Sequence, residues 1–242
     1  MELKLIHFYP DLMSLYGSYA NVAVLKRQLQ QMGNSVTVET VVPGIENVSL
    51  SDADFIFMGA GTERAQKAAL ADFVRYESAV KAAAEAGTVM LFAGTSMELL
   101  GKTITDDAGK EYQGIGLAGF TTVQGKKRFV EDVYGATDLY PEPVVGFINK
   151  CSTISGIDTP LLATVQLGYG NEGLKTPEGF HYKNVIGSHL TGPILVKNPR
   201  LLDAVVAAIY SKRGESLPAE RPVNQWTEDG YTITAEQLKQ RI

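Results

Sequence analysis

The chain has 242 residues, 45% of them hydrophobic and 20% charged, which suits a domain of about 200 residues with an appendage, or two small domains. Its net charge of −5 gives no sign of a nucleic-acid-binding surface. The single cysteine, Cys151, excludes an internal disulfide framework and fits a reducing compartment. Without a signal peptide after Met1 or an apolar run longer than a strand, we expect a cytoplasmic protein with no membrane span.

The first hundred residues alternate between apolar strands and helices. Strands are expected at 3–8, 36–42, 55–58 and 89–92. One helix should start at Ser18 or Asn21 and end near Gly33, and a long one should run from Glu63 to Ala86. This alternation predicts an α/β fold with a doubly wound, mostly parallel sheet.

The second half has a different pattern. Short strands are expected at 120–123, 128–133, 144–148, 161–167 and 184–190, several of them antiparallel and added at one edge of the first sheet. A hairpin-like turn is expected at 106–109, and a last helix should run from Asn198 to Gly214. We therefore expect one domain over 1–214, followed by a polar tail over 215–242 that lies on the domain or on a partner. A short helix is expected at 234–241.

The stretch 88–101 combines a strand, a tight turn of small residues and a short helix that stops at Gly101. A nucleophile elbow has this build, and the amides of its turn can stabilise an oxyanion. By spacing, however, the apex is Gly94, which has no side chain. The sequence thus predicts the backbone of a nucleophilic site without an obvious nucleophile.

Two loops should meet where a ligand binds in such a sheet, beyond the carboxyl ends of its strands. These are the Gly59-Ala60-Gly61 loop, where a backbone can approach a ligand closely, and the turn with Thr95. The glycine loop lacks the Lys-Ser/Thr ending of a phosphate-binding loop, so we expect no nucleotide there. The Asp106-Asp107 pair is typical of a turn, and we expect neither a metal nor a cofactor.

Several segments carry a resemblance to a known family over nearly the whole chain. They are Leu-Tyr-Gly at 15–17 through Asn21, 59–66, 99–102, 114–117, 145–147, Gly-Tyr-Gly-Asn at 168–171, 178–184 and Thr-Gly-Pro-Ile-Leu at 191–195. The chain resembles the class I glutamine amidotransferases of the cobyric-acid-synthase (CobB/CobQ-like) type. Within that family it is most similar to the glutaminase subunits of lipid II isoglutaminyl synthases. The resemblance implies a flavodoxin-like class I glutaminase fold and a Mur-ligase-like synthetase as partner in peptidoglycan precursor amidation.

The resemblance also shows what is missing. The family's elbow reads Cys-Gly-Gly-Tyr-Gln-x-Leu-Gly, and counting back from Gly101 puts Gly94 in the cysteine position. The family's catalytic histidine precedes Gly-Pro, where this chain has Thr191. Glycine offers no attacking atom, and the threonine hydroxyl is a poor general base. We therefore expect no ordinary glutaminase activity and no catalytic residue at either position.

Four nearby side chains could take part in a substitute site. Ser96 and Thr95 stand in the turn, where such hydroxyls usually cap the helix. Cys151 lies on what the resemblance makes a loop over the site, and His189 precedes Thr191 by two residues, which is about 7 Å along a strand. A relocated Cys151–His189 or Ser96–His189 pair is the alternative to a structural role for each.

Arg128 aligns with an arginine that the family places at its glutamine site. It is either a carboxylate clamp or part of a solvated basic turn with Lys126 and Lys127. Three functions follow from these readings. The chain is a catalytically impaired partner subunit, an amidotransferase or hydrolase with a relocated nucleophile, or a glutamine sensor; a cobalamin-pathway role is less favoured.

Overall fold

The main sheet of the computed structural model, which describes residues 1–45 and 48–242, has the strand order β10-β11-β4-β3-β1-β2. Neighbours are parallel except at the edge strand β10. Without β10 this is the 2-1-3-4-5 order of flavodoxin-like folds, with β11 as the fifth strand. The strands are β1 (Glu2–Phe8), β2 (Ser35–Val41), β3 (Phe55–Met58), β4 (Val89–Ala93), β10 (Phe180–Tyr182) and β11 (Val185–Ser188).

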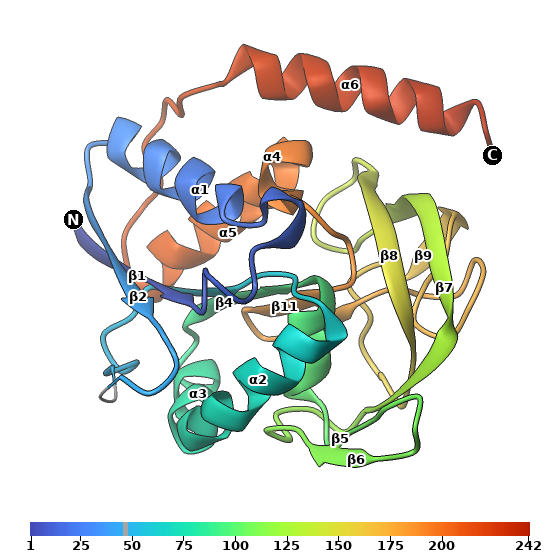
Figure 1. The fold of residues 1–242 in the computed structure, drawn as a ribbon. Coiled ribbons are helices and arrows are strands. Elements are labelled where there is room, and N and C mark those ends of the chain that lie inside the picture. Colours follow the sequence, from blue (N-terminus) through green and yellow to red (C-terminus); the bar gives the residue numbers. More distant parts are fainter. Residues whose placement is uncertain (46–47) are drawn as a thin grey trace.

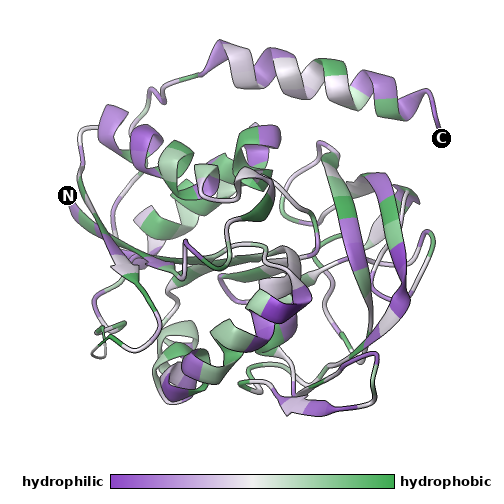
Figure 2. Cartoon of the chain, viewed as in Figure 1, coloured by the Kyte–Doolittle hydropathy of each residue, from purple (hydrophilic) through white to green (hydrophobic). Residues whose placement is uncertain are grey.

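Helices cover both faces of this sheet (Figure 1). Because side chains alternate along a strand, Leu3 and Leu5 share one hydrophobic cluster with α1 (Ala20–Gln31) and α5 (Pro199–Lys212). Ile6 and Phe8 share the other cluster with α2 (Glu63–Phe73) and α3 (Glu77–Glu85). Accordingly, the strands of the main sheet are mostly green in Figure 2. The expected α/β fold with a mostly parallel, doubly wound sheet is confirmed.

The long helix expected from Glu63 to Ala86 is wrong, because a 3₁₀ turn, η2 (Val74–Tyr76), separates α2 from α3. In a 3₁₀ turn, residues three apart lie on the same side. Here Phe73 and Tyr76 both pack edge-on against Phe8, with ring centroids 5.2 and 5.1 Å away. Periodicity does not reveal this break, because tertiary aromatic packing rather than a glycine or proline accompanies it.

The second half forms a sheet of its own, with the order β6-β5-β7-β8 and with β9 beside β7. Its strands are β5 (Thr103–Thr105), β6 (Glu111–Gln113), β7 (Thr121–Ala136), β8 (Val144–Ser155) and β9 (Thr164–Leu167). The two strands expected at 120–123 and 128–133 are one long strand, β7, with a register shift between Gln124 and Phe129. The strand expected at 184–190 is β11, which is parallel to β4 inside the main sheet.

The last 28 residues, 215–242, form what we call the C-terminal arm, whose helix α6 (Gln225–Lys239) crosses over the body at the top of Figure 1. Asn224 caps this helix by accepting a hydrogen bond from the amide of Trp226. The sequence predicts this helix only at 234–241, which places the start of the helix about two turns too late. Contacts far away in the sequence, such as Arg200 with Glu228 at 2.7 Å, help hold its first turns on the body.

Three short elements complete the fold beside the site. The 3₁₀ segments η1 (Leu15–Gly17) and η3 (Gly94–Leu100) follow β1 and β4, and α4 (Ile194–Lys197) follows β11. Over the described residues, none of the helices combines the length and apolar character that crossing a membrane requires.

Candidate functional site

Four strands of the main sheet end around one cavity of about 230 Å³, which we call the elbow cleft. The segments after β1, β3, β4 and β11 each contribute to it, as expected for a sheet whose ligand crevice lies beyond its carboxyl ends. β7 and β8 supply the remaining wall. It is lined by Leu15, Tyr16, Ala60, Gly61, Thr62, Glu63, Gly94, Thr95, Arg128, Asn149, Lys150, His189 and Thr191.

Gly94 is the apex of the turn after β4 and has a left-handed backbone, with φ +68°. A Cβ atom placed on it would lie 2.5 Å from the Cβ of Ala60, closer than real Cβ contacts come. Any side chain at the apex therefore requires Ala60 to move, in addition to the strain of the positive φ. The backbone has the build of a nucleophile elbow, and the Cβ of Ala60 crowds the position where a nucleophilic side chain would begin.

The Thr95 hydroxyl bridges the turn to the glycine loop. Its Oγ1 accepts a hydrogen bond from the Gly61 amide and donates one to the Gly61 carbonyl, both at 3.0 Å. The buried Ser96 hydroxyl contacts the carbonyls of Met58 and Ala93, at 2.8 and 3.0 Å. The prediction that these hydroxyls cap the helix is wrong, because Thr95 bonds to the loop after β3 and Ser96 bonds to the last residue of β3 and to Ala93. The Gly61 amide is thus occupied by Thr95.

Thr191 lines the same cleft as Gly94. Its hydroxyl donates to the carbonyl of Phe147 at 3.0 Å, and its amide donates to the same carbonyl at 2.8 Å. These two hydrogen bonds hold the segment after β11 against β8. Thr191 thus connects the two segments, and its hydroxyl donates its proton to a backbone carbonyl.

The rim of the elbow cleft is a chain of hydrogen bonds that includes Arg128. The Nε of Arg128 donates to Asn149 at 2.8 Å, and its Nη2 pairs with Glu63 at 3.0 Å. Asn149 in turn donates to the hydroxyl of Tyr16 at 2.9 Å. Arg128 thus lies in β7 and not in a turn, and its side chain, which is 45% exposed, lines the cleft with the Glu63 carboxylate on its guanidinium. Its role as a carboxylate clamp stays a prediction.

Cys151 lies in β8 and not on a loop, and its thiol donates to Glu63 at 3.3 Å. Burial, together with the neighbouring Glu63 carboxylate, raises the pKa of the Cys151 thiol to about 12. At neutral pH the side chain is a protonated thiol, which is a weak nucleophile. The hydrogen bonds of Cys151, Ser96 and His189 among the described residues lead to different partners and do not join either nucleophile to the histidine.

Behind the elbow lies a buried polar cluster centred on Glu98, which we call the Glu98 network. The carboxylate accepts hydrogen bonds from Ser152 at 2.6 Å and from the amides of Gln66 and Gln124 at 2.7 and 2.8 Å. His189 Nε2 lies 3.2 Å from it. Burial by itself raises the pKa of Glu98, but the hydrogen bonds from His189, Ser152 and Gln66 outweigh it and lower the pKa to about 2. Glu98 is therefore a fully buried, fully bonded carboxylate.

His189 connects this network to the cleft. Burial, with the Lys150 ammonium nearby, lowers the pKa of His189 to about 4, so the ring is neutral near pH 7. A ring with its proton on Nε2 donates to Glu98, while Nδ1 lies 3.8 Å from a carboxylate oxygen of Glu178. Burial likewise lowers the pKa of Lys150 to about 8, and its ammonium donates to the carbonyls of Gly170 and Asn171. His189 and Lys150 both line the cleft, but the hydrogen bonds described for them go to groups of the protein interior and not to groups that line the cleft.

Comparisons with known proteins agree with this architecture. Residues 4–199 match the model of the CobB/CobQ-like glutamine amidotransferase domain. The chain belongs to this family. It is 30% identical over 213 residues to the lipid II isoglutaminyl synthase (glutamine-hydrolyzing) subunit GatD of Staphylococcus aureus strain N315, covering 88% of this chain and 86% of that protein. It is 32% identical over 215 residues to the subunit of the same name from Streptococcus pneumoniae strain R6, covering 88% and 82%.

Within this amidotransferase domain, sequence reasoning missed two features. The role of Glu98 is one of them, although a charged residue inside the apolar stretch 97–100 already indicates a buried, paired carboxylate. Ala60 was treated as a loop residue, and its obstruction of the apex depends on a contact across two strands that no local pattern reveals. Among the described residues, no group of three or more His, Cys, Asp or Glu side chains could hold a metal ion.

Proposed function

We propose that this chain is the glutaminase-fold subunit of a two-component amidotransferase that amidates the peptidoglycan precursor lipid II, and that it has lost glutamine hydrolysis. Its partner is a Mur-ligase-like synthetase. The two curated relatives, whose names assign them to lipid II isoglutaminyl synthase, support the pathway and make a cobalamin role second to it. The loss of hydrolysis rests on one observation, namely that the Cβ of Ala60 crowds the apex position at Gly94.

The remaining cleft chemistry supports the same proposal. An acyl-transfer site needs a nucleophile, a base and free donors for the oxyanion. Here the apex is glycine, the Thr191 hydroxyl bonds to Phe147, and the Gly61 amide bonds to Thr95. Removing one member of a nucleophile–base pair typically costs several orders of magnitude in rate, so we expect no measurable glutamine turnover.

The test is amidation of lipid II by the complex of this chain with its synthetase, supplied with either glutamine or ammonium as the nitrogen source. We expect product with ammonium and none above background with glutamine. Glutamine-dependent product would contradict the loss of hydrolysis. If that product then disappeared in Cys151→Ala or Ser96→Ala, it would assign catalysis to a relocated nucleophile.

A second function, glutamine sensing, is favoured by Arg128 and Glu63 at the rim of the cleft. A guanidinium and a carboxylate 3.0 Å apart present the two charges that complement the carboxylate and ammonium of an amino acid. A ligand that binds the folded chain raises its Tm, so millimolar glutamine or glutamate should do so in the wild type and not in Arg128→Ala. Arg64→Ala, on the same helix as Glu63 but outside the cleft, is the matched control. No shift in the wild type rules sensing out.

A further inference from the structure

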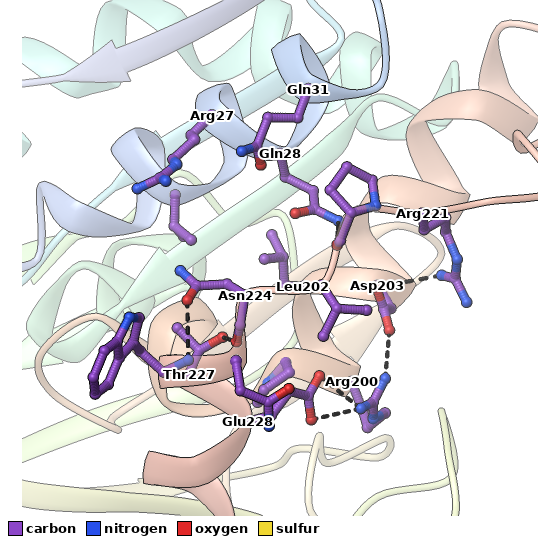
Figure 3. A pocket seen from close by; sticks show the side chains of 16 residues that line it. Arg27, Gln28, Gln31, Arg200, Leu202, Asp203, Arg221, Asn224, Thr227 and Glu228 are labelled. Carbon is purple, nitrogen blue, oxygen red and sulfur yellow. Dashed lines mark hydrogen bonds and ion pairs between the residues drawn. The ribbon is translucent and has the colours of Figure 1, made fainter.

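A second cavity, of about 470 Å³, lies between the C-terminal arm and the body of the domain, far along the chain from the elbow. Helices α1 and α5 form one side of it, and arm residues 221–228 form the other (Figure 3). Its volume is that of an ordinary small-molecule site. It is lined by Val24, Arg27, Gln28, Gln31, Pro199, Arg200, Leu202, Asp203, Arg221, Pro222, Val223, Asn224, Gln225, Trp226, Thr227 and Glu228.

Two of its three arginines are neutralised by the chain itself. Arg200 donates to both oxygens of Glu228, each at 2.7 Å, and to Asp203 at 2.8 Å. Arg221 pairs with Asp203 at 3.3 Å. Figure 3 shows these ion pairs grouped on one side of the cavity. They fasten the arm to α5 and leave no surplus charge on that side.

Arg27 is the exception. It projects from α1, away from these ion pairs in Figure 3, and it has no hydrogen bond or ion pair to any residue that the structure describes. With Arg27, Arg200 and Arg221 against Asp203 and Glu228, the lining carries one uncompensated positive charge. A free guanidinium at a cavity wall favours an anion, and its planar fork suits a phosphate or carboxylate group.

An aromatic side chain and one amide without a described partner line the same cavity as this charge. Trp226, the only tryptophan of the chain, is 88% exposed, so the face of its indole is open to stacking. Gln31 lies one turn after Arg27 on α1, and its amide offers both a donor and an acceptor, whereas the amide of Gln28 already donates to the carbonyl of Pro222. A bare anion uses only the arginine, whereas a heterocyclic base can use the indole face and the Gln31 amide as well.

We propose that the cavity under the C-terminal arm binds a nucleoside phosphate, with its phosphate on Arg27 and its base stacked on Trp226. The apolar floor made by Val24 and Leu202 accommodates the sugar and base, and the ion pairs of Arg200 keep the arm in place over the ligand. This site is independent of the elbow cleft, since the linings of the two cavities share no residue.

The single tryptophan makes the test direct, because its fluorescence reports on this cavity alone. ADP is titrated into the full chain, with adenosine and inorganic phosphate in parallel and free tryptophan amide as the reference for light absorbed by the nucleotide. We expect saturable quenching by ADP. Adenosine lacks the anion and phosphate lacks the ring, so each should bind at least about tenfold more weakly.

Variants separate the two contacts. Arg27→Ala should weaken ADP binding about tenfold or more, while Lys26→Ala, which removes a neighbouring charge outside the lining, should leave it unchanged. Calorimetry then compares Trp226→Phe, which keeps an aromatic face and should bind within a few-fold of the wild type, with Trp226→Ala, which should lose about tenfold. Absence of saturable quenching by ADP, or equal losses in Arg27→Ala and Lys26→Ala, would overturn the proposal.

Discussion

The front and the back of the elbow differ sharply, although both belong to the segment 94–100. At the front, the cleft is lined by Gly94 and Thr95 of this segment, together with Thr191 from the segment after β11. The hydroxyls of Thr95 and Thr191 bond only to backbone groups. At the back, Glu98 is bonded to four side chains with no exposed surface left. The front thus consists of small residues bonded to the backbone, while the buried carboxylate behind the turn has a full set of side-chain partners. If the proposed loss of hydrolysis holds, the two sides of the elbow should respond very differently to substitution.

The largest expected effect comes from breaking the back of the elbow. Glu98→Ala leaves Ser152, His189 and two glutamine amides without their acceptor in a buried site, and we expect a loss of about 3–5 kcal/mol in the free energy of unfolding. Chemical denaturation measures it. Glu98→Gln keeps one carbonyl acceptor and should lose clearly less; an equal loss in both variants would argue against the hydrogen-bond network as the cause.

The next effect tests the obstruction at the front. Gly94→Ala combines a left-handed backbone with a contact of 2.5 Å to the Cβ of Ala60, and we expect a loss of about 2–4 kcal/mol. Gly33→Ala is the matched control, because Gly33 has φ +84° and open space around its Cβ position. It should lose only about 1 kcal/mol.

A double variant separates the two causes at Gly94. Adding Ala60→Gly removes the 2.5 Å contact with the Cβ but leaves the Cα of residue 60 at 3.1 Å and the backbone strain, so Gly94→Ala should cost less in that background without becoming neutral. Additive effects of the two substitutions would show that Ala60 does not obstruct the apex.

The pH dependence of stability reports on His189 at the boundary between front and back. Its pKa of about 4 in the folded chain lies below the ordinary value of 6.5, so between these values the unfolded chain binds the extra proton. Stability is therefore fully present above about pH 6.5 and is lost as the pH falls toward 4. Between about pH 7 and pH 5 the loss from this group is about 2 kcal/mol.

Two variants show which histidine causes this dependence of stability on pH. His7 is buried, and burial alone lowers its pKa to about 4, so it contributes in the same window. We expect His189→Asn and His7→Leu each to flatten the unfolding free energy between pH 7 and pH 5. In the wild type the low pKa of Glu98 keeps its titration below this window, but His189→Asn also removes a contact that lowers the Glu98 pKa, so His7→Leu is the variant that changes only one group. An unchanged slope in His189→Asn would mean that the folded ring takes up a proton as readily as the unfolded one.

The smallest effect is expected at Thr191. Thr191→Val keeps the shape and removes only the hydroxyl bond to Phe147, whose carbonyl retains the amide of residue 191. We expect a loss of no more than about 1 kcal/mol in thermal or chemical unfolding. A loss as large as that of Glu98→Ala would erase the distinction between front and back.

Local pattern was sufficient for the four strands of the first hundred residues, but it did not predict β10 or the place of β11 beside β4 in the same sheet. The strands at 55–58 and 89–93 and the turn at Gly94 were predicted within a residue, because apolar runs and glycine act locally. The joining of β7 into one strand and the start of α6 depend on partners distant in the sequence, such as Arg200 for Glu228. The obstruction by Ala60 and the bonds of Thr95 are likewise contacts between strands, which spacing along one strand cannot predict.

The Glu98 network has a consequence for how the molecule unfolds. Its members come from η3, α2, β7, β8 and the end of β11, so the carboxylate joins the main sheet to the second sheet. Separating the sheets would strand that charge in a nonpolar interior or expose its partners at once, which ties the opening of one to the opening of the other. We therefore expect the two sheets to unfold together, in one cooperative transition.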